Sequence, residues 1–374
     1  MTRALSYCGF LLAAFAAAGF VVFVAGTRAF EIVPLETVSE TSSNASIGDL
    51  NGDGHPDIVL VKGRHWQVTS RTFFGDGHGH FTLGPALPSK AIKSYSASLA
   101  DMTGSGHLDM VLSNDQPDPK LVLLNDGTGH FTIGGRYGDP TWSTRNAAVG
   151  DLNGDGHPDI AVANREMTSF VCFNDSKLHF DCHPLEDSPS AATVAIADMN
   201  GDGANDVIYA CRDSCQSVVY FNDGKANFAR KEPWGPPKSS TRAMAVADFD
   251  GDGHLDIAAC PEELGCFVYL NDGTGTFRSG IQFQTQKALP YSMIAADLNG
   301  DHHPEILVGY VEAPGVVYFN DGTGKKYQRV PFGDGKGAIY GMAAGDLNGD
   351  EWPDVVVARS EAPCFVMFNR PPKK

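Results

Sequence analysis

Hydrophobic and polar positions follow a pattern that recurs along most of the chain. In the copy around residue 150, small apolar residues at 144–150 predict a first strand, polar residues at 151–159 a loop, and the apolar run 160–163 a second strand. Residues 170–173 and 180–184 predict a third strand and an edge strand. No amphipathic helical pattern competes with this interpretation, so each unit is predicted to be four short antiparallel strands.

The polar loop marks seven copies of the unit, spaced 47 to 52 residues apart. A period of this length is typical of repeat architectures. Seven four-stranded units predict an all-β fold, a seven-bladed β-propeller, rather than a sandwich, because radial repetition leaves only short, protected sheet edges. The regular spacing leaves little room for another domain, so residues 30–374 are predicted to form one propeller. The loops begin at Asp49, Asp101, Asp151, Asp198, Asp248, Asp297 and Asp346.

Closure of the ring is also predicted from the two ends of the pattern. The seventh copy stops after its third strand, at residues 364–369. Residues 30–35 resemble the fourth strand of the first copy, at residues 81–87. The N-terminal strand is therefore expected to complete the last blade.

A second marker follows each of the first six loops. It is a turn of the Asn-Asp-Gly type between two hydrophobic runs, and these residue types tolerate the positive φ angles of tight hairpins. We expect it to join the third and fourth strands of each blade. The markers begin at Phe74, Leu124, Phe173, Phe221, Leu270 and Phe319.

The residue types of the loops predict calcium binding. Ca²⁺ takes six to eight oxygen ligands, and positions 1, 3, 5 and 9 of the loop offer Asp, Asn or Glu while position 7 offers its backbone carbonyl. Glycine at positions 4 and 6 lets the chain wrap closely around an ion. The first loop has Leu60 at position 12, where an EF-hand needs Glu, so an EF-hand is excluded.

Six of the seven loops carry a complete ligand set, so up to six Ca²⁺ are expected. The sixth and seventh loops, with His302 and Glu351 at the position of the second glycine, should bind more weakly. The second loop has Thr103 and Ser105 at two ligand positions and is expected to be empty or weak. The predicted ligands are Asp49, Asn51, Asp53, His55 and Asp57; Asp151, Asn153, Asp155, His157 and Asp159; Asp198, Asn200, Asp202, Ala204 and Asp206; Asp248, Asp250, Asp252, His254 and Asp256; Asp297, Asn299, Asp301, His303 and Glu305; and Asp346, Asn348, Asp350, Trp352 and Asp354.

Histidine recurs at position 7, which raises zinc as an alternative. Because that position contributes its carbonyl, its side chains should point outward, one per blade and too far apart to share an ion. Zinc is therefore not expected.

These motifs resemble a known family. The repeated core Gly-Asp-Leu-Asn-Gly-Asp-Gly-His-Pro-Asp-Ile-Val, followed by Phe/Leu-Asn-Asp-Gly-Thr-Gly-His/Thr-Phe, is similar to FG-GAP/VCBS repeats, whose Ca²⁺ loops resemble those of integrin α-subunit propellers. The resemblance covers residues 30–369. It implies a secreted or cell-surface propeller used for adhesion, for glycan binding or beside an enzyme domain, and it implies no single activity.

The N-terminal residues predict export. A short basic start precedes a mostly apolar, uncharged run at 9–25 and small residues suited to cleavage, so residues 1–29 are predicted to be a signal peptide. An uncleaved membrane anchor is the alternative, because seventeen residues are close to the minimum for spanning a bilayer. The expected location is secreted, periplasmic or at the cell surface, and a monomer is expected.

Cysteine spacing supports the same compartment. Three close pairs predict cross-strand disulfides, which persist in oxidising environments. Cys364 would remain as a buried structural thiol rather than a nucleophile, because no His lies near it in sequence. The predicted pairs are Cys172 with Cys182, Cys211 with Cys215, and Cys260 with Cys266.

The net charge of −17 is explained by the metal loops. Each complete loop holds three or four carboxylates, and six divalent ions would neutralise most of the excess. The chain has no basic stripe, so nucleic acid is not an expected partner.

A candidate ligand site lies on the face opposite the loops, where the innermost strands begin. Six residues before each loop Asp stand Ser43, Tyr95, Arg145, Ala192, Arg242, Tyr291 and Tyr340. Tyr95, Arg145, Arg242, Tyr291 and Tyr340 could form a recognition ring for a sugar, a carboxylate or a protein loop. Trp142, Trp234 and Arg359 are expected on the same face. The alternative is that these side chains fill the funnel and satisfy one another.

The predicted function is therefore a binding or adhesion module for a glycan or a cell-surface protein, not an enzyme. No catalytic triad order, phosphate loop or metalloprotease helix occurs in the sequence. A hydrolase or lyase using funnel-face acids, or a purely structural scaffold, remain alternatives. Catalysis would require two loop acids to converge in one cleft; the candidates are Asp139, Glu166, Glu262, Glu312 and Glu361.

Overall fold

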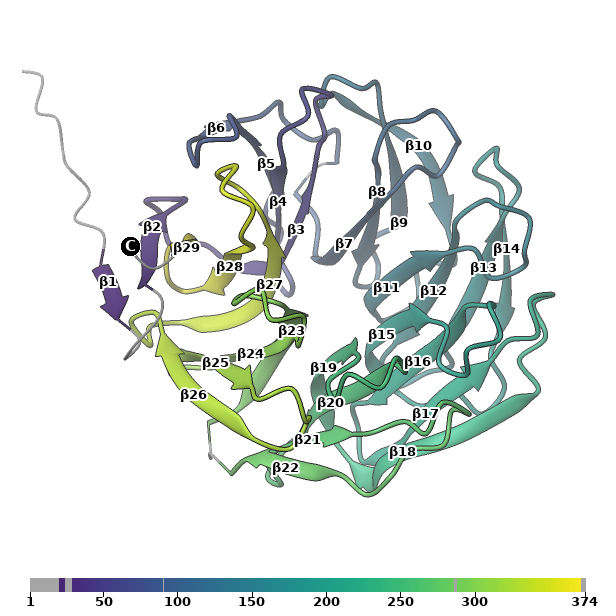
Figure 1. Cartoon of the computed structure of the whole chain (residues 1–374). Helices are drawn as coiled ribbons and strands as arrows, with labels where there is room; N and C mark the ends of the chain where they lie inside the picture. The colour runs from purple at the N-terminus through teal and green to yellow at the C-terminus, as the bar shows by residue number, and fades with distance from the viewer. Residues whose placement is uncertain (1–19, 24–28, 90, 286–287, 371–374) are drawn as a thin grey trace, which may run out of the picture.

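A computed structural model describes residues 20–23, 29–89, 91–285 and 288–370. Throughout these ranges the regular secondary structure is β-strand, arranged as seven antiparallel sheets around a central axis (Figure 1). The predicted seven-bladed β-propeller is confirmed. No helix in the described part of the chain is long and apolar enough to cross a membrane.

The first four blades follow one another along the chain. Blade 1 contains β3 (Ser42–Gly48), β4 (Asp57–Lys62), β5 (Arg71–Gly75) and β6 (Phe81–Leu83). Blade 2 contains β7 (Ser94–Ala100), β8 (Asp109–Asn114), β9 (Lys120–Asn125) and β10 (Phe131–Tyr137). Blade 3 contains β11 (Thr144–Gly150), β12 (Asp159–Asn164), β13 (Phe170–Asn174) and β14 (Phe180–Pro184). Blade 4 contains β15 (Ala191–Ala197), β16 (Asp206–Cys211), β17 (Cys215–Phe221) and β18 (Arg230–Ser239).

The remaining blades complete the ring. Blade 5 contains β19 (Thr241–Ala247), β20 (Asp256–Pro261), β21 (Cys266–Tyr269) and β22 (Ile281–Gln284). Blade 6 contains β23 (Pro290–Ala296), β24 (Glu305–Tyr310), β25 (Gly315–Asn320) and β26 (Tyr327–Phe332). Blade 7 contains β27 (Ala338–Gly345), β28 (Asp354–Ser360), β29 (Phe365–Arg370) and, from the other end of the chain, β2 (Ala29–Pro34).

The two ends of the chain close the ring as predicted. Strand β2 pairs antiparallel with β29, and Phe30 lies opposite Asn369. Phe30 is fully buried beside Met367, so closure also adds apolar contacts. Strand β1 (Phe20–Phe23), inside the predicted leader, pairs with β2. The small residues suited to cleavage are 24–26 or 27–29; of these, residues 24–28 lie outside the described residues, as do residues 1–19, whereas Ala29 begins β2.

The hydrophobic core lies between neighbouring blades. The second strand of every blade is buried along its whole length, because each of its faces packs against a sheet. Position 2 of each loop adds a buried side chain to these contacts, as Leu50 does between blades 1 and 2. Burying such a side chain stabilises the fold by about 2 kcal/mol. Apolar residues in the loop motif therefore hold adjacent blades together.

The three predicted disulfides are present. Cys172 and Cys182 face each other across β13 and β14, whereas the pairs Cys211–Cys215 and Cys260–Cys266 close turns between second and third strands. Cys364 is free and buried, and burial raises the pKa of its thiol to about 11. Three disulfides are typical of proteins that mature in an oxidising compartment.

Candidate functional site

Position 9 of each acidic loop is a buried carboxylate that joins the loop to the blade. In blade 4, Asp206 Oδ2 accepts a hydrogen bond from Met199 N at 2.9 Å and Oδ1 accepts one from Asn222 N at 2.8 Å. Asp57, Asp109, Asp159, Asp256 and Asp354 accept the two equivalent bonds. This carboxylate therefore holds the start of the loop and the end of the third strand at fixed positions.

Positions 1, 3 and 5 form a nest of short-range hydrogen bonds. In the first loop, Asp49 accepts bonds from the amides of Gly52 and Gly54, at 2.7 and 2.9 Å. Asn51 Oδ1 accepts a bond from Asp53 N at 3.0 Å. These bonds turn side-chain oxygens toward the inside of the loop, the arrangement that a hard cation needs. The loop of Asp151 makes the same bonds.

Blade 5 has the loop best prepared for a cation. Carboxylate oxygens of Asp248, Asp250 and Asp256 lie within 4.8 Å of one another, the one such acidic group in the part of the chain that is described. Asp250 Oδ1 is buried and has no hydrogen-bond partner. An unsatisfied buried carboxylate oxygen beside two further carboxylates is costly without a counter-ion. The residues of this loop therefore fit a divalent cation.

The crowding of acids changes their pKa values. The pKa of Asp206 and of Asp256 is raised to about 6, first by burial and then by neighbouring loop carboxylates, while backbone hydrogen bonds oppose the shift. Burial likewise raises the pKa of Glu305 to about 8 and of Asp354 to about 7. Each of these groups would gain from a nearby positive charge.

Two loops depart from the common backbone chemistry. His302 and Glu351 adopt φ angles of 67° and 68°, the left-handed region that a glycine occupies in the other loops. For a residue with a Cβ atom this conformation costs roughly 1 kcal/mol. In the second loop, which lacks two carboxylate or amide ligands, Ser105 N still donates to Asp101 Oδ1 at 2.9 Å. The loop shape therefore persists where the ligand set is incomplete.

The side chains at position 7 lie over the hairpin turns. A Cβ added to Gly77 would come within 2.3 Å of the His55 ring, and one on Gly273 within 2.5 Å of the His254 ring. Glycine is therefore needed in these turns for two reasons: the backbone has a positive φ, and the histidine ring occupies the space that a Cβ atom would fill. Trp352 occupies the same loop position and packs against Gly300 of blade 6.

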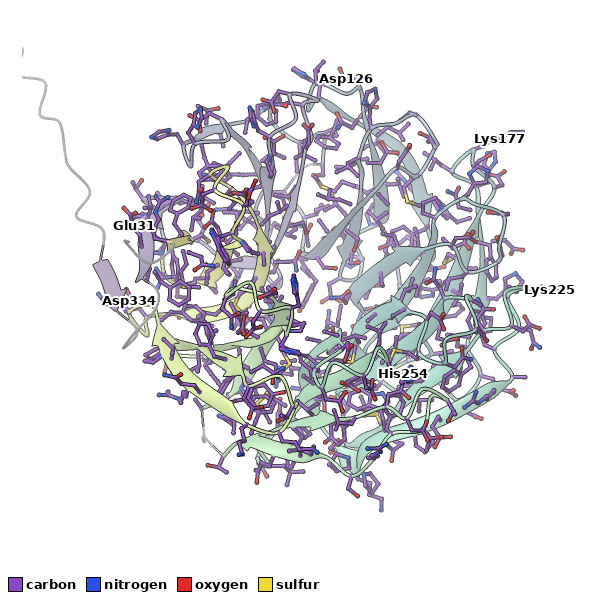
Figure 2. The ribbon with its side chains drawn as sticks, in the orientation of Figure 1. Glu31, Asp126, Lys177, Lys225, His254 and Asp334 are labelled. Atoms are coloured by element: carbon purple, nitrogen blue, oxygen red, sulfur yellow. A yellow bond between two sulfur atoms is a disulfide. The ribbon has the colours of Figure 1, made fainter. Side chains whose placement is uncertain are left out.

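The asparagine of the hairpin turn has a role that the sequence pattern did not reveal. Asn222 Nδ2 donates to Leu152 O of blade 3 at 2.8 Å and to Asn205 O at 3.0 Å. Equivalent bonds between neighbouring blades start at Asn125, Asn174, Asn271, Asn320 and Asn369. We call these six residues the asparagine staples. In blade 1, Gly75 stands at this position and makes no side-chain bond. The turns themselves reach the rim of the disc, as the labelled Asp126, Lys177 and Lys225 show (Figure 2).

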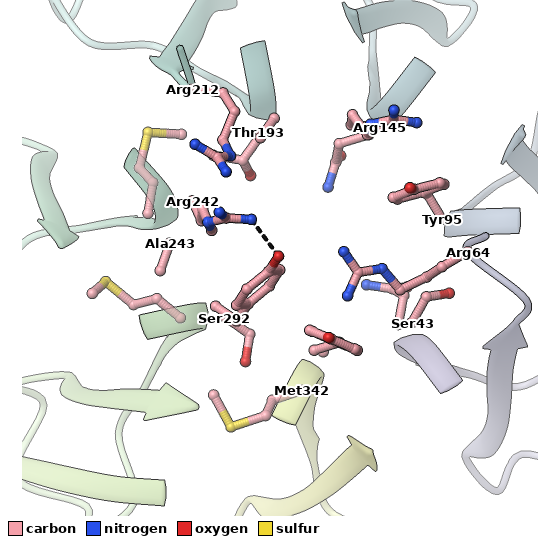
Figure 3. Close-up of a pocket in the computed structure, with 18 of the residues that line it drawn as sticks. Ser43, Arg64, Tyr95, Arg145, Thr193, Arg212, Arg242, Ala243, Ser292 and Met342 are labelled. Carbon is pink, nitrogen blue, oxygen red and sulfur yellow. Dashed lines mark hydrogen bonds between the residues drawn. The ribbon is translucent and has the colours of Figure 1, made fainter. Parts of the chain in front are cut away.

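The opposite face opens into a cavity of about 280 Å³ on the axis of the ring, here called the funnel. All seven residues predicted from their place before each loop line it, from Ser43 in blade 1 to Tyr340 in blade 7. Arg64 projects into the funnel from one side, and Arg212 and Arg242 from the opposite side (Figure 3). The predicted gathering of Tyr95, Arg145, Arg242, Tyr291 and Tyr340 at one site is thus observed.

Three arginines of the funnel escaped the sequence pattern. Arg64, Arg165 and Arg212 follow the second strands of blades 1, 3 and 4 and also line the cavity. Arg165 N and Arg212 N donate to Ser143 O and Ser190 O, at 2.9 and 2.7 Å, which aims both turns at the axis. The signal was available in the sequence, because each of these arginines lies fourteen or fifteen residues after the loop Asp of its own copy.

Arginine and tyrosine stack on one another around the funnel. The guanidinium carbon of Arg64 lies 3.7 Å from the ring centroid of Tyr340, 5.0 Å from that of Tyr291 and 5.4 Å from that of Tyr95. Arg145 lies over Tyr95 and Arg242 over Tyr291, both at 4.4 Å. The cations and aromatic faces therefore support each other.

Carboxylates outside the cavity lining contact four of the five funnel arginines. Asp115 lies 2.8 Å from Arg145 Nη1, and Glu262 contacts Arg242 Nε. Arg165 donates to Asp213 from Nε, at 3.2 and 3.3 Å, and from Nη2, at 3.1 Å, and also contacts Glu166. Arg212 Nη1 makes longer contacts, at 3.7 Å to Glu262 and 4.0 Å to Asp213. Burial lowers the pKa of its guanidinium group, and nearby Arg242 lowers it further.

Several residues expected on the funnel face lie elsewhere. Trp142 stacks on Phe170, and Trp234, on the edge strand β18, packs on Tyr269; both side chains lie in the core between blades. Arg359 does not line the cavity; its Nη1 pairs with Asp334 Oδ1 at 2.5 Å. The acids Asp139, Glu166, Glu262, Glu312 and Glu361 are absent from the lining of the cavity. Glu262 alone among these five contacts two funnel arginines.

Comparison with known proteins places the chain in a family. Its sequence matches the FG-GAP-like repeat at residues 49–112, 101–162, 190–259, 262–308 and 309–357. This chain therefore belongs to the FG-GAP-like repeat family, which confirms that the repeated motifs are FG-GAP repeats. No curated protein matches its sequence significantly.

Solved propellers share the fold at low sequence identity. BBS1N, in a crystal structure with ARL6DN, aligns with a TM-score of 0.62 and 10% identity over 95% of this chain and 97% of its own. The propeller of Dos1 aligns with a TM-score of 0.59 and 13% identity over 90% of this chain and 95% of its own. These similarities concern the architecture alone.

Proposed function

We propose that this protein is an exported, non-catalytic binding module that recognises a glycan or protein ligand in the funnel. The observation that carries the proposal is the funnel itself, where every blade contributes lining residues and guanidinium and phenol groups converge. Concave sites with a few convergent polar groups are the usual form of ligand pockets. The site lies on the axis, so only the closed ring can assemble it.

The position of the acids favours binding over catalysis. Glycosidases place two carboxyl groups about 5–10 Å apart on either side of the reacting bond. Here the five candidate acids stay outside the cavity lining, and Glu262 is engaged with Arg242. The funnel offers donors to a ligand, and no carboxylate lies in its lining.

A protein remains among the candidate ligands. One similar propeller, BBS1N, was crystallised in complex with ARL6DN. That complex illustrates a propeller of this architecture with a macromolecular partner. The three disulfides support export of the present chain, since they persist in oxidising compartments.

Calcium has a structural role in this proposal. Positions 1, 3, 5 and 9 of six loops would hold it through side-chain oxygens, and position 7 through its carbonyl. The unsatisfied Asp250 Oδ1 and the convergence of three carboxylates in blade 5 support this assignment. A bound ion would supply positive charge that lets the loop acids lie close together.

A glycan-array screen of the purified protein, repeated with and without Ca²⁺, tests the funnel as a binding site. The test variant carries Arg145→Ala, Arg242→Ala and Tyr291→Ala; the matched control carries Arg136→Ala, Lys177→Ala and Lys225→Ala on the rim. We expect specific binding that the funnel variant loses and the rim variant retains. A protein ligand would be sought in parallel with the immobilised protein and the same two variants. Binding that survives the funnel substitutions would contradict the proposal.

A further inference from the structure

The funnel has a charge opposite to that of the molecule. The chain carries a net charge of −17, yet five arginines and no carboxylate line this cavity. Low-dielectric walls concentrate the field of such a cluster within the cavity. An anion entering the funnel would therefore experience a local attraction despite the acidic surface elsewhere. The five arginines are Arg64, Arg145, Arg165, Arg212 and Arg242.

The tyrosine faces are already covered. A neutral sugar usually stacks on an open aromatic ring, but Arg64, Arg145 and Arg242 occupy the faces of Tyr340, Tyr95 and Tyr291. A guanidinium that lies flat on a ring directs its N–H groups along its edge. The surface presented to a ligand is accordingly an array of hydrogen-bond donors, which suits the oxygens of an oxyanion.

Arg64 is the arginine with the least compensation. Each of the other four has a carboxylate within 4.0 Å. Arg64 forms no ion pair with any described residue, and its recorded cation contacts are to the three tyrosine rings. It projects toward the centre of the cavity from blade 1 (Figure 3). One positive charge at the axis therefore lacks a carboxylate partner among the described residues.

The backbone holds Arg64 at this place. Gly63, with φ of 119°, donates to Thr41 O at 2.9 Å, and Arg64 N donates to Ser94 O of blade 2 at the same distance. A Cβ on Gly63 would lie 2.6 Å from Ile92 O, so only glycine fits without displacement. Arg64 itself has a left-handed φ of 48°. The turn thus carries the side chain across the seam between blades 1 and 2 to the axis.

We infer that the funnel selects ligands bearing an oxyanion, a carboxylate, sulfate or phosphate group, and that Arg64 is its principal anchor. This inference rests on the proposed function and specifies the ligand class of the same site. Arg64 supplies the uncompensated charge, and Arg242 and Arg212 face it across the cavity. A volume of about 280 Å³ suits a group the size of one sugar ring or a small organic acid.

Calorimetric titration of the purified, Ca²⁺-loaded protein in a phosphate-free buffer of low ionic strength tests the inference. The probes are sodium D-glucuronate, D-glucose and sodium sulfate; the two sugars share a ring and differ in the carboxylate. We expect glucuronate to bind and glucose not to bind. Arg64→Gln should weaken glucuronate binding about ten- to hundred-fold, the usual effect of losing a charge-assisted hydrogen bond. Arg136→Gln, on the exposed edge of β10, is the matched control and should change nothing.

The sulfate titration, the salt dependence and a second arginine variant give further tests of the inference. Sulfate binding as tight as glucuronate binding would support the inference and identify the oxyanion itself, rather than its carrier, as the recognised group. Added salt should weaken binding in either case. If Arg64→Gln lowers the melting temperature, Arg212→Gln provides a second test of the same charge cluster.

Two outcomes would overturn the inference. Equal binding of glucose and glucuronate would show a site for neutral sugar, and the proposed function would stand. Binding of none of the three probes would remove the oxyanion preference. The array screen with the Arg145, Arg242 and Tyr291 substitutions then decides separately whether the funnel is a binding site.

Discussion

The two faces of this propeller use the same repeat in opposite ways. On the loop face, nearly every copy presents the same residues: a buried position-9 carboxylate, an apolar position 2 and an asparagine staple to the preceding blade. On the funnel face, equivalent positions hold serine, tyrosine, arginine, alanine, arginine, tyrosine and tyrosine. Repeated residues build the scaffold, whereas the residues that differ between copies define a site on the axis that no single blade contains.

The two faces are also stabilised differently. The loop face relies on hydrogen bonds that recur from blade to blade and, in our proposal, on Ca²⁺. The funnel face relies on individual features, such as the disulfide Cys211–Cys215 beside Arg212 and the stacking of Arg64 on tyrosine. Removing a scaffold feature should therefore reduce stability, while changing a funnel side chain should mainly affect binding.

Calcium removal should have the largest effect on stability. Six ions bound with the affinity of extracellular modules would together stabilise the native state by about 4 kcal/mol or more at extracellular calcium. We expect a chelator to lower the melting temperature by several degrees, measured by differential scanning calorimetry. Asp250→Ala should reduce the number of bound ions by one, whereas Thr103→Ala, at the same position of the second loop, should leave it unchanged. A melting temperature insensitive to chelator would contradict the proposed role of the loops.

Loss of a buried position-9 carboxylate should have the second-largest effect on stability. Asp206→Ala would leave the buried amides of Met199 and Asn222 without acceptors, at a cost of about 3 kcal/mol. Urea unfolding in the presence of chelator measures this cost without a contribution from metal. Asp202→Ala, in the exposed part of the same loop, is the control and should cost less than about 1 kcal/mol. Equal losses would show that position 9 serves only as a metal ligand.

An asparagine staple should contribute somewhat less. Asn222→Ala removes two donor bonds, including the bond to Leu152 O of blade 3, and should lower the free energy of unfolding by about 2 kcal/mol. Asn227→Ala, exposed at the same turn, provides the comparison in urea unfolding. If the two variants are equally stable, the bond between blades adds nothing to the scaffold.

A funnel arginine should have the smallest effect on stability. Burial and nearby Arg242 disfavour the charge of Arg212 in the folded protein, and its carboxylate contacts, at 3.7 and 4.0 Å, offset this only in part. Arg212→Gln should change the free energy of unfolding by less than about 1 kcal/mol, toward greater stability. Arg165→Gln, which breaks the hydrogen-bonded ion pair with Asp213, should instead destabilise by about 1 kcal/mol. Strong destabilisation by Arg212→Gln would place that residue in the scaffold.

The sequence predicted the fold and one of the two sets of funnel residues, those that stand six residues before each loop Asp, but not the arginines that follow the second strands. Strand boundaries such as Thr144–Gly150 follow from local alternation and from loop residues with strict backbone needs, and repetition shows the pattern seven times. The funnel ring was found because its members keep a constant distance from the loop Asp. Trp142 and Trp234 were misplaced because sequence spacing does not show which way a side chain points near the end of a blade, and packing against Phe170 and Tyr269 decided it.

The sequence by itself determined the number of blades, the ring closure, the disulfide pairs and the chemistry of the loops, because each depends on residues that are close in sequence or that recur at a fixed period. Only the tertiary structure decided which side chains meet on the axis, that asparagine joins neighbouring blades, and that Arg64 lacks a carboxylate partner. These properties depend on distances between residues of different blades, which lie far apart in the chain, and those distances exist only once the ring has closed.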